Sequence, residues 1–252
     1  MPRGFQLSEG EYLLRNIEQA VIEAPLFPPV RKIKGRRHGP MKISVTSRKN
    51  KKNMNAFENL LLEGHYELGA FYWLESNASV LWYKPQPFTV RFHDGNRITS
   101  YVGDFLAAMN DGTYTLFEVK KSTNLDDPAV ASRLARLKGA FAKTDVAFEV
   151  LESNVLNAKP KFDTLLKLYG QTASAIVGSS ALEAAKNEVL KSLRYLGGKA
   201  DFDELQSSSP FINEAGVAMA LFDGLVTSSF KFPMGKLFDI SLTSLGEREC
   251  QH

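Results

Sequence analysis

Cysteine is almost absent from this sequence, in which Cys250 is the only one among 252 residues and histidine occurs four times. One cysteine cannot build a disulfide framework, and so few sulfur and imidazole ligands exclude a zinc site of the cysteine–histidine type. Long apolar runs are also missing, since none approaches the roughly eighteen residues of a membrane span. The first residues contain no apolar core like that of a signal peptide. We therefore expect a cytoplasmic protein without a membrane partner.

Acidic residues are missing from one long stretch of the chain. From Arg31 to Lys52 there are ten lysines or arginines and no acid, although the whole chain has a net charge of only +3. The rest of the chain is therefore net acidic. Such a block is usually a solvated or disordered tail, and in some proteins it is an arm that binds nucleic-acid phosphates. Because Gly35, Gly39 and Pro40 interrupt it, we expect extended or poorly ordered structure.

A hairpin pattern is the clearest feature that the sequence does contain. Residues 98–108 and 113–121 predict two strands, joined by a turn at Asn110-Asp111-Gly112. Glycine in the turn supplies the positive φ that tight hairpin loops need. This hairpin is the element around which the other predicted elements are arranged.

The hairpin gathers two carboxylates and one ammonium. A three-residue loop makes Met109 pair with Thr113, and counting back along both strands brings Asp104 opposite Glu118. Lys120 shares the face of Glu118 because side chains alternate along a strand. Opposed like charges are destabilising, and a hard divalent cation between their oxygens would resolve the conflict. The alternative from the spacing alone is a surface ion cluster on a solvated strand.

Four short motifs follow one another in the chain: Glu67-Leu-Gly-Ala-Phe-Tyr-Trp-Leu-Glu75, Lys84-Pro-Gln-Pro87, Gly103-Asp-Phe-Leu106 and Glu118-Val-Lys120. In this order and spacing they resemble the TnsA family of transposon-end endonucleases, which belong to the restriction-endonuclease-like nucleases. The resemblance covers roughly residues 30–170. One departure is Gly103, where relatives often have proline or threonine, and it leaves the geometry of that strand open.

The resemblance implies a fold, an activity and a set of partners. The fold is an α/β, restriction-endonuclease-like mixed sheet flanked by helices. The activity is Mg²⁺-dependent cleavage of the 5′ strands at transposon ends, with Mn²⁺ able to substitute. The metal ligands are Glu67, Asp104 and Glu118, and Lys120 completes the catalytic set. The partners are double-stranded DNA, a TnsB-type transposase that cuts and joins the 3′ ends, and a TnsC-type AAA+ ATPase that engages the C-terminal domain.

The third metal ligand rests on a predicted helix. That helix begins at a cap on Asn53 or Asn55, runs to about residue 75, and has a stripe formed by Phe57, Leu60, Gly64, Glu67, Phe71 and Leu74. An acid within an apolar stripe is costly unless it is paired or bound to metal. Glu58 and Glu63 are rival acids, and Glu67 could instead reach water at the edge of the stripe. The family pattern, which places Glu67 in register with Gln86, favours Glu67.

Beside a nuclease, the basic segment is expected to hold DNA through its phosphates rather than to read bases. The expected DNA-binding residues are Arg31, Lys32, Lys34, Arg36, Arg37, Lys42, Arg48, Lys49, Lys51 and Lys52, with Lys121 after the second hairpin strand.

The remaining pattern completes the division into domains. Residues 1–52 are expected to form a helix, over 9–23 after a capping box at Ser8, and the basic arm. Residues 53–170 are expected to form the catalytic domain, with further strands at 80–83, 88–92 and 146–151. A helix from Pro128 to about 143, capped by Asp126, and a helix over 162–169 that ends at Gly170 complete that domain.

A second domain is expected over residues 181–246, after a linker at 171–180. Helices at 181–196, at 201–206 and from Pro210, followed by strands at 226–232 and 237–242, predict a mostly helical winged-helix-like domain. Its third helix has no basic residue between Pro210 and Leu221, which favours binding to a protein over binding to DNA. Two other functions remain open: a stand-alone restriction- or phage-type endonuclease, and a catalytically inert DNA-binding regulator.

Overall fold

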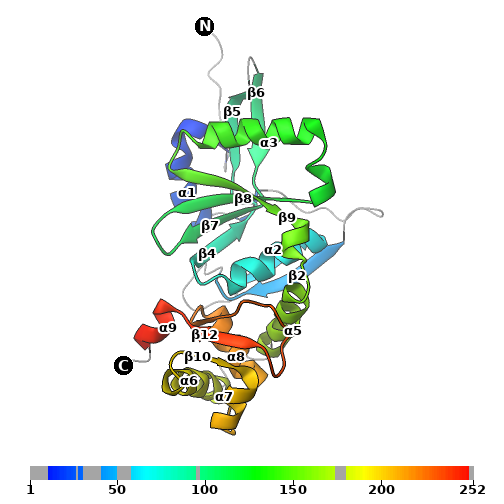
Figure 1. Ribbon diagram of the computed structural model, residues 1–252. Coiled ribbons are helices and arrows are strands. Elements are labelled where there is room, and N and C mark those ends of the chain that lie inside the picture. The colour runs from blue at the N-terminus through cyan, green and yellow to red at the C-terminus, as the bar shows by residue number, and fades with distance from the viewer. Residues whose placement is uncertain are drawn as a thin grey trace. The chain divides into compact units, whose positions relative to one another are not determined.

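The computed structural model describes residues 11–26, 28–30, 41–49, 58–94, 97–173 and 180–249 (Figure 1). These residues form two compact units. The first holds the described residues up to Leu68 together with Val80–Val155, and the second holds Gly69–Ser79 and the described residues from Leu156 onward. Helices and strands are mixed, so the predicted α/β class is confirmed. Among the described residues, no helix is long and apolar enough to cross a membrane.

The first unit contains three sheets: β2 with β3, the order β1-β5-β6, and the order β4-β7-β8-β9. The pairing is antiparallel except for β1 with β5 and β8 with β9. The strands and helices of this unit are β1 (Glu11–Leu13), η1 (Leu14–Asn16), α1 (Ile17–Glu23), η2 (Ala24–Leu26), β2 (Lys42–Ser47), β3 (Glu58–Glu63), the start of α2 (His65–Ser76), β4 (Val80–Pro85), β5 (Thr89–Asp94), β6 (Arg97–Val102), β7 (Phe105–Met109), β8 (Tyr114–Lys120), η3 (Ser122–Asn124), α3 (Pro128–Phe141), β9 (Val146–Glu152) and most of α4 (Ser153–Leu156).

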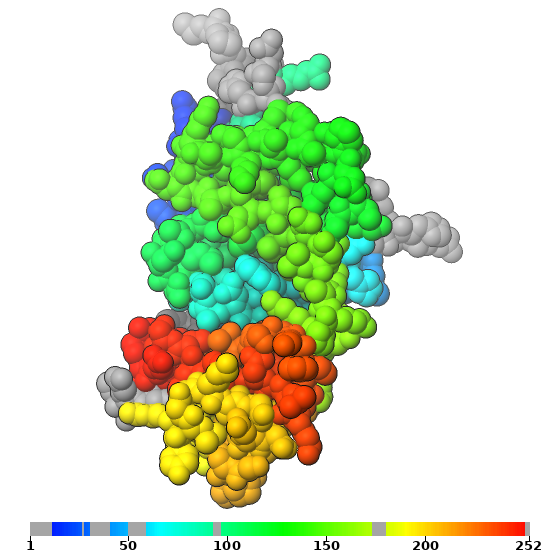
Figure 2. Space-filling view, in the orientation of Figure 1, coloured from blue at the N-terminus to red at the C-terminus, as the bar shows by residue number. Residues whose placement is uncertain are grey.

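The core of the first unit is a cluster of buried side chains from α1, α3 and five strands, β5 to β9. Helix α3 buries Leu137 and Phe141 against it and leaves its other face on the surface visible in Figure 2. Its N-cap is Asp127, whose carboxylate accepts a hydrogen bond from the N–H of Ala129 (2.8 Å). The prediction that Asp126 caps this helix was therefore wrong by one residue, because Asp127 directly precedes Pro128 at the first helical position.

The strand predicted over 98–108 is interrupted at Gly103 and Asp104. Strand β6 ends at Val102 and pairs with β5, whereas β7 begins at Phe105 and pairs with β4 and β8. A Cβ on Gly103 would lie 2.6 Å from Cγ and Cδ1 of Leu116, so this leucine fills the space that a side chain would need. Asp104 consequently lies at the junction of two sheets.

The helix predicted over residues 53–75 was wrong in its first half. Residues 58–63 form β3, which pairs with β2, and α2 begins only at His65, after Gly64 adopts a φ of +91°. Leu60 and Leu62 are buried whereas Leu61 is 40% exposed, and this alternation is that of a strand. The expected caps at Asn53 and Asn55, and Phe57 of the stripe, lie outside the described residues.

The N-terminal helix predicted over 9–23 is also shorter than expected. Residues 11–13 form β1 beside β5, and the α-helix covers only Ile17–Glu23, where Ile17, Ala20 and Val21 are buried. The capping box at Ser8 lies outside the described residues. In the basic segment, β2 over Lys42–Ser47 agrees with the expected extended structure.

The second unit is mostly helical. Besides the greater part of α2, it contains α5 (Lys161–Ala173), α6 (Ser180–Tyr195), β10 (Lys199–Asp201), α7 (Phe202–Ser208), α8 (Glu214–Phe222), β11 (Val226–Thr227), β12 (Asp239–Leu242) and α9 (Ser244–Glu249). Its strands form one sheet in the order β10-β12-β11. Phe71 and Tyr72 of α2 pack on Tyr169 of α5, whose ring also meets Phe222 of α8 edge-on.

Several predicted boundaries in this unit were wrong. Helix α5 continues through Gly170, where an added Cβ would meet open space. The third helix is opened by Asn213, which accepts from the N–H of Gly216 (2.9 Å), and not by Pro210. The strand predicted over 226–232 is only two residues long, and β10 was not predicted. Of the expected linker, residues 174–179 lie outside the described residues.

Candidate active site

The hairpin of β7 and β8 has the predicted register. The N–H of Met109 donates to the carbonyl of Thr113 (2.9 Å), and the antiparallel pairing runs back from there to Phe105. One residue further, Asp104 stands opposite Glu118. The predicted register of the hairpin is therefore confirmed, whereas the expectation that the carboxylates of Asp104 and Glu118 form one site stays a prediction.

Asp104 is held in place by the backbone around it. Its Oδ2 accepts a hydrogen bond from the N–H of Val119 (2.7 Å), its own N–H donates to Phe117 (2.9 Å), and its carbonyl accepts from the N–H of Gln86 (2.8 Å). The residue is 9% exposed. A carboxylate in such surroundings has a fixed direction, as a group that orients a ligand must have.

Glu118 is more deeply buried, at 5% exposure, and its two oxygens have different partners. Oε2 accepts a hydrogen bond from the hydroxyl of Tyr101 (2.6 Å), and Oε1 is paired with the ammonium of Lys120. The side chain of Lys120 is 25% exposed. The ammonium of Lys120 thus lies between the buried carboxylate of Glu118 and the solvent.

Tyr101 was not predicted to belong to this group. It lies on β6 and is 3% exposed, with its ring edge-on to Phe141 and Phe148 and 5.9 Å from the guanidinium carbon of Arg133. Burial, followed by the nearby charge of Glu118, raises the pKa of the Tyr101 hydroxyl. The hydroxyl therefore remains a neutral hydrogen-bond donor. On an unbroken strand, Tyr101 would face away from Asp104.

Glu67 lies in the first turn of α2 and is 8% exposed. Its Oε2 accepts a hydrogen bond from the N–H of Glu63 (2.7 Å), so this carboxylate supports the entry into its own helix. Glu58 and Glu63, predicted as rivals on the same helix, lie on β3 instead. Within the described ranges, no three Asp, Glu, His or Cys side chains form a group ready to hold a metal ion.

The chemistry of the hairpin carboxylates nevertheless suits Mg²⁺ or Mn²⁺, which favour carboxylate oxygens. Glu118 supplies such oxygens from β8, and Asp104 supplies them from the bend before β7, where its Oδ2 accepts a hydrogen bond from the N–H of Val119, next to Glu118. Mg²⁺ commonly retains several waters and uses only one or two carboxylates. Two protein carboxylates therefore suffice for such a site, and Glu67, whose Oε2 already accepts a hydrogen bond from the N–H of Glu63, is a further candidate.

Gln86 is an unusual neighbour of Asp104. It is 2% exposed, adopts a positive φ of 45°, and its Nε2 has no hydrogen-bond partner among the described residues. Left-handed backbone at a residue other than glycine costs about 1–3 kcal/mol and is concentrated at functional sites. A buried amide without a hydrogen-bond partner further lowers the stability of the folded state. Gln86 thus marks the Asp104 end of the hairpin as strained.

The predicted DNA-binding residues fall into two groups. Lys42 on β2 and Lys121 after β8 are exposed, whereas Arg48 is half-buried and Lys49 is only 8% exposed, which makes its ammonium a poor phosphate contact. The others lie outside the described residues: Arg31, Lys32, Lys34, Arg36, Arg37, Lys51 and Lys52.

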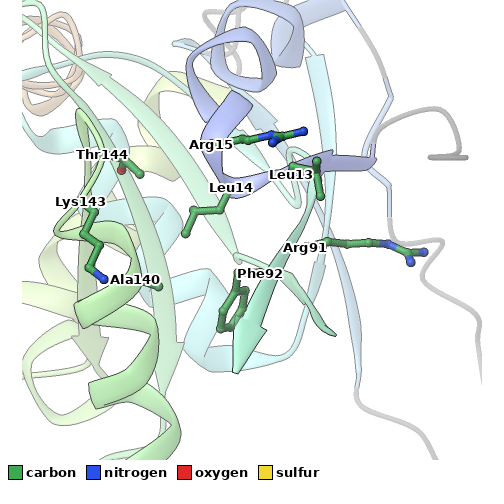
Figure 3. Close-up of a pocket in the computed structure, with 8 residues that line it drawn as sticks. All are labelled: Leu13, Leu14, Arg15, Arg91, Phe92, Ala140, Lys143 and Thr144. Carbon is green, nitrogen blue, oxygen red and sulfur yellow. The ribbon is translucent and has the colours of Figure 1, made fainter. Parts of the chain in front are cut away.

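A pocket of about 580 Å³ lies elsewhere in the first unit, between β1, η1, β5 and the end of α3 (Figure 3). Its lining is partly apolar, with Leu14 and Phe92, and partly basic, with Arg15, Arg91 and Lys143. In Figure 3 the two guanidinium groups point away from Lys143, so these charges do not converge on one ligand position. None of the predicted catalytic residues lines this pocket, which is therefore not the candidate active site.

Comparison with known proteins finds neither a protein-family model nor a curated protein that matches this chain.

Proposed function

We propose that this protein is a metal-dependent DNA endonuclease of the TnsA type, which cleaves the 5′ strands at transposon ends. The observation that carries the proposal is the end of the hairpin, where Asp104 accepts from the N–H of Val119, next to Glu118, and Glu118 pairs with Lys120. The four motifs that resemble the family support it. Under this proposal the first unit is a restriction-endonuclease-like domain, with β4-β7-β8-β9 as its mixed sheet.

Asp104 and Glu118 would hold Mg²⁺ or Mn²⁺, with Glu67 as the third candidate ligand. A bound Mg²⁺ would lower the pKa of a coordinated water and polarise a phosphoryl oxygen. The N–H of Val119 fixes Asp104 and the hydroxyl of Tyr101 fixes Glu118, so both carboxylates are oriented before the cation and DNA arrive.

Lys120 has the second role in the proposed reaction. Its ammonium lies beside Glu118 and reaches the surface, so it can hold a water molecule or a phosphate oxygen at the edge of the site. Hydrolysis breaks the bond between phosphorus and the 3′ oxygen, which is the leaving group. A positive charge at this position stabilises the negative charge that develops on the phosphate oxygens.

The second unit supports a role in protein binding. Its order α6, β10, α7, α8, β11, β12 is compatible with the proposed winged-helix-like fold, in which the third helix usually enters the major groove. Here α8 is buried along most of its length, from Gly216 to Phe222, and it carries no basic residue. A helix enclosed in this way cannot read a groove. We therefore assign this unit to a TnsC-type ATPase, and DNA binding to the basic arm and the first unit.

A catalytically inert DNA-binding regulator is the second candidate. The observation that favours it is the absence, within the described ranges, of a ready group of three metal ligands. Such a protein would still bind DNA through exposed cations such as Lys42 and Lys121, and it would cleave nothing even with every partner present.

The test is 5′-strand cleavage of a plasmid carrying transposon ends, in the presence of a TnsB-type transposase and a TnsC-type ATPase. Asp104→Ala and Lys120→Ala should each reduce cleavage about 10²-fold or more. Ca²⁺ should bind but support little reaction, because its looser coordination misplaces the attacking water. Asp126→Ala, an exposed aspartate outside the hairpin, is the control.

Near-normal cleavage by Asp104→Ala in Mg²⁺, or full activity of the wild type in EDTA, would overturn the proposed chemistry. Normal DNA binding by a wild type that never cleaves would establish the inert regulator instead. Cleavage at a defined sequence by the purified protein alone would indicate a stand-alone nuclease.

A further inference from the structure

Glu118 has a partner that belongs to another sheet. The hydroxyl of Tyr101, on β6, donates to Glu118 Oε2 at 2.6 Å, and Glu118 is on β8. Strand β6 pairs with β5, and β8 pairs with β7 and β9. This hydrogen bond therefore ties the two sheets together beside Asp104, at the interruption between β6 and β7.

The ring of Tyr101 has little freedom to move. It is 3% exposed and meets Phe148 at 5.9 Å and 71° and Phe141 at 6.4 Å and 77°. Both phenylalanines are themselves buried in the core of the first unit. The aromatic packing fixes the ring, and the ring in turn fixes the direction of the hydroxyl that Glu118 accepts.

We infer that Tyr101 is a positioning residue, which holds the Glu118 carboxylate in the orientation that binds the divalent cation. This inference rests on the proposed function, because it assigns Glu118 as a ligand. A carboxylate oxygen has two lone pairs, so Oε2 can accept the Tyr101 hydrogen bond and still offer a lone pair to a cation. The hydroxyl is neutral, so it orients Glu118 without competing for the cation as a charge would.

The second partner of Glu118 makes this orientation necessary. Lys120 pairs with Oε1 and is partly exposed, so its side chain can draw the carboxylate toward the surface. With the hydroxyl of Tyr101 holding Oε2, the carboxylate cannot rotate to give both oxygens to the ammonium. The ammonium remains available for water or phosphate, and Oε2 of the carboxylate keeps the position set by Tyr101.

Tyr101→Phe removes only the hydroxyl and keeps the packed ring. Loss of a hydrogen bond to a metal ligand typically weakens metal affinity about 10- to 100-fold. Direct Mn²⁺ binding to the full chain, followed by electron paramagnetic resonance of the free ion, should show a weakening of this size. Cleavage should fall at limiting Mn²⁺ and return toward the wild-type rate at saturating Mn²⁺, which a general loss of structure would not produce.

Tyr12→Phe is a matched control in the same unit. The hydroxyl of Tyr12 donates to Glu23 Oε2 at 2.5 Å, so this variant also removes one tyrosine–glutamate hydrogen bond, but away from the hairpin. It should leave Mn²⁺ affinity unchanged. Thermal unfolding of both variants shows how much each hydroxyl contributes to folding, independently of metal.

The possible results distinguish the role of Tyr101 from the proposed function of the protein. Unchanged or tighter Mn²⁺ binding by Tyr101→Phe, with binding still abolished by Asp104→Ala, overturns the role of Tyr101 and leaves the proposed function standing. Equal weakening by Tyr101→Phe and Tyr12→Phe also overturns it, because the effect would then reflect stability alone. Absence of Mn²⁺ binding to the wild type, or binding that Asp104→Ala does not alter, overturns both.

Discussion

Gly103→Ala tests how closely Leu116 packs against the backbone next to Asp104. A Cβ at residue 103 would lie 2.6 Å from both Cγ and Cδ1 of Leu116 and 3.0 Å from Cδ2. Leu116 is fully buried in the core cluster, so it cannot yield without displacing its neighbours. Overpacking of this kind costs about 1–3 kcal/mol. We expect Gly103→Ala to lower the free energy of unfolding of the first unit by that amount.

A second substitution isolates the cause. Leu116→Ala removes the atoms that would clash and should cost about 2–5 kcal/mol, because it leaves a cavity in the core. In the double variant the new methyl group at residue 103 occupies part of that cavity. The two losses should therefore not add, and the double variant should be about 1–3 kcal/mol more stable than their sum.

Urea unfolding followed by tryptophan fluorescence measures these free energies. The chain has two tryptophans, and a Trp73→Phe background leaves Trp82 as the fluorescent reporter of the first unit. The ring centroids of Trp82 and Tyr114 are 6.2 Å apart. Gly139→Ala is the control, because a Cβ there meets nothing within 4 Å and alanine favours a helix interior by about 1 kcal/mol. Additive losses in the double variant, or a Gly103→Ala protein as stable as the wild type, would refute the packing argument.

Two further predictions concern the turn and the strained glutamine. Hydrogen bonds from the hydroxyl and then the N–H of Thr113 lower the pKa of Asp111, so its stabilisation is present above its ordinary pKa of 3.8 and is lost as the pH falls. Thermal unfolding should show Asp111→Ala less stable than the wild type at neutral pH and equal to it in acid; a constant difference would count against this. Gln86→Leu removes the buried Nε2 that has no hydrogen-bond partner among the described residues. The free energy of unfolding should be unchanged or higher by about 1 kcal/mol, and the rate of DNA cleavage should fall. A normal cleavage rate would show that the amide serves no function.

The register of the central hairpin was predictable because it depends on local information. A three-residue loop containing Gly112, which adopts a φ of +86°, sets the pairing of Met109 with Thr113. Every later pair follows by counting, and this brings Asp104 to Glu118. Such an argument needs no knowledge of the rest of the fold.

The sequence-based predictions were wrong where the local structure depends on residues that are distant in the sequence. The run Leu60-Leu61-Leu62 suits either a helix or a strand, and pairing with β2 decides in favour of the strand. The role of Tyr101 could not be foreseen because strand periodicity places it on the face opposite to Asp104. In the structure the strand is interrupted after Val102, at Gly103, and the hydroxyl of Tyr101 reaches Glu118.

The charges on the hairpin explain why a cation and a DNA strand would bind there together. Asp104 and Glu118 carry two negative charges against the one positive charge of Lys120, so these three side chains sum to −1. A phosphodiester is also negative, and two such groups in a poorly solvated site repel each other strongly. A divalent cation between the carboxylates changes the sum to +1, which attracts the phosphate. The same cation that activates water would therefore be required for DNA to enter the site, and weakening of its affinity by Tyr101→Phe should weaken cleavage through both effects.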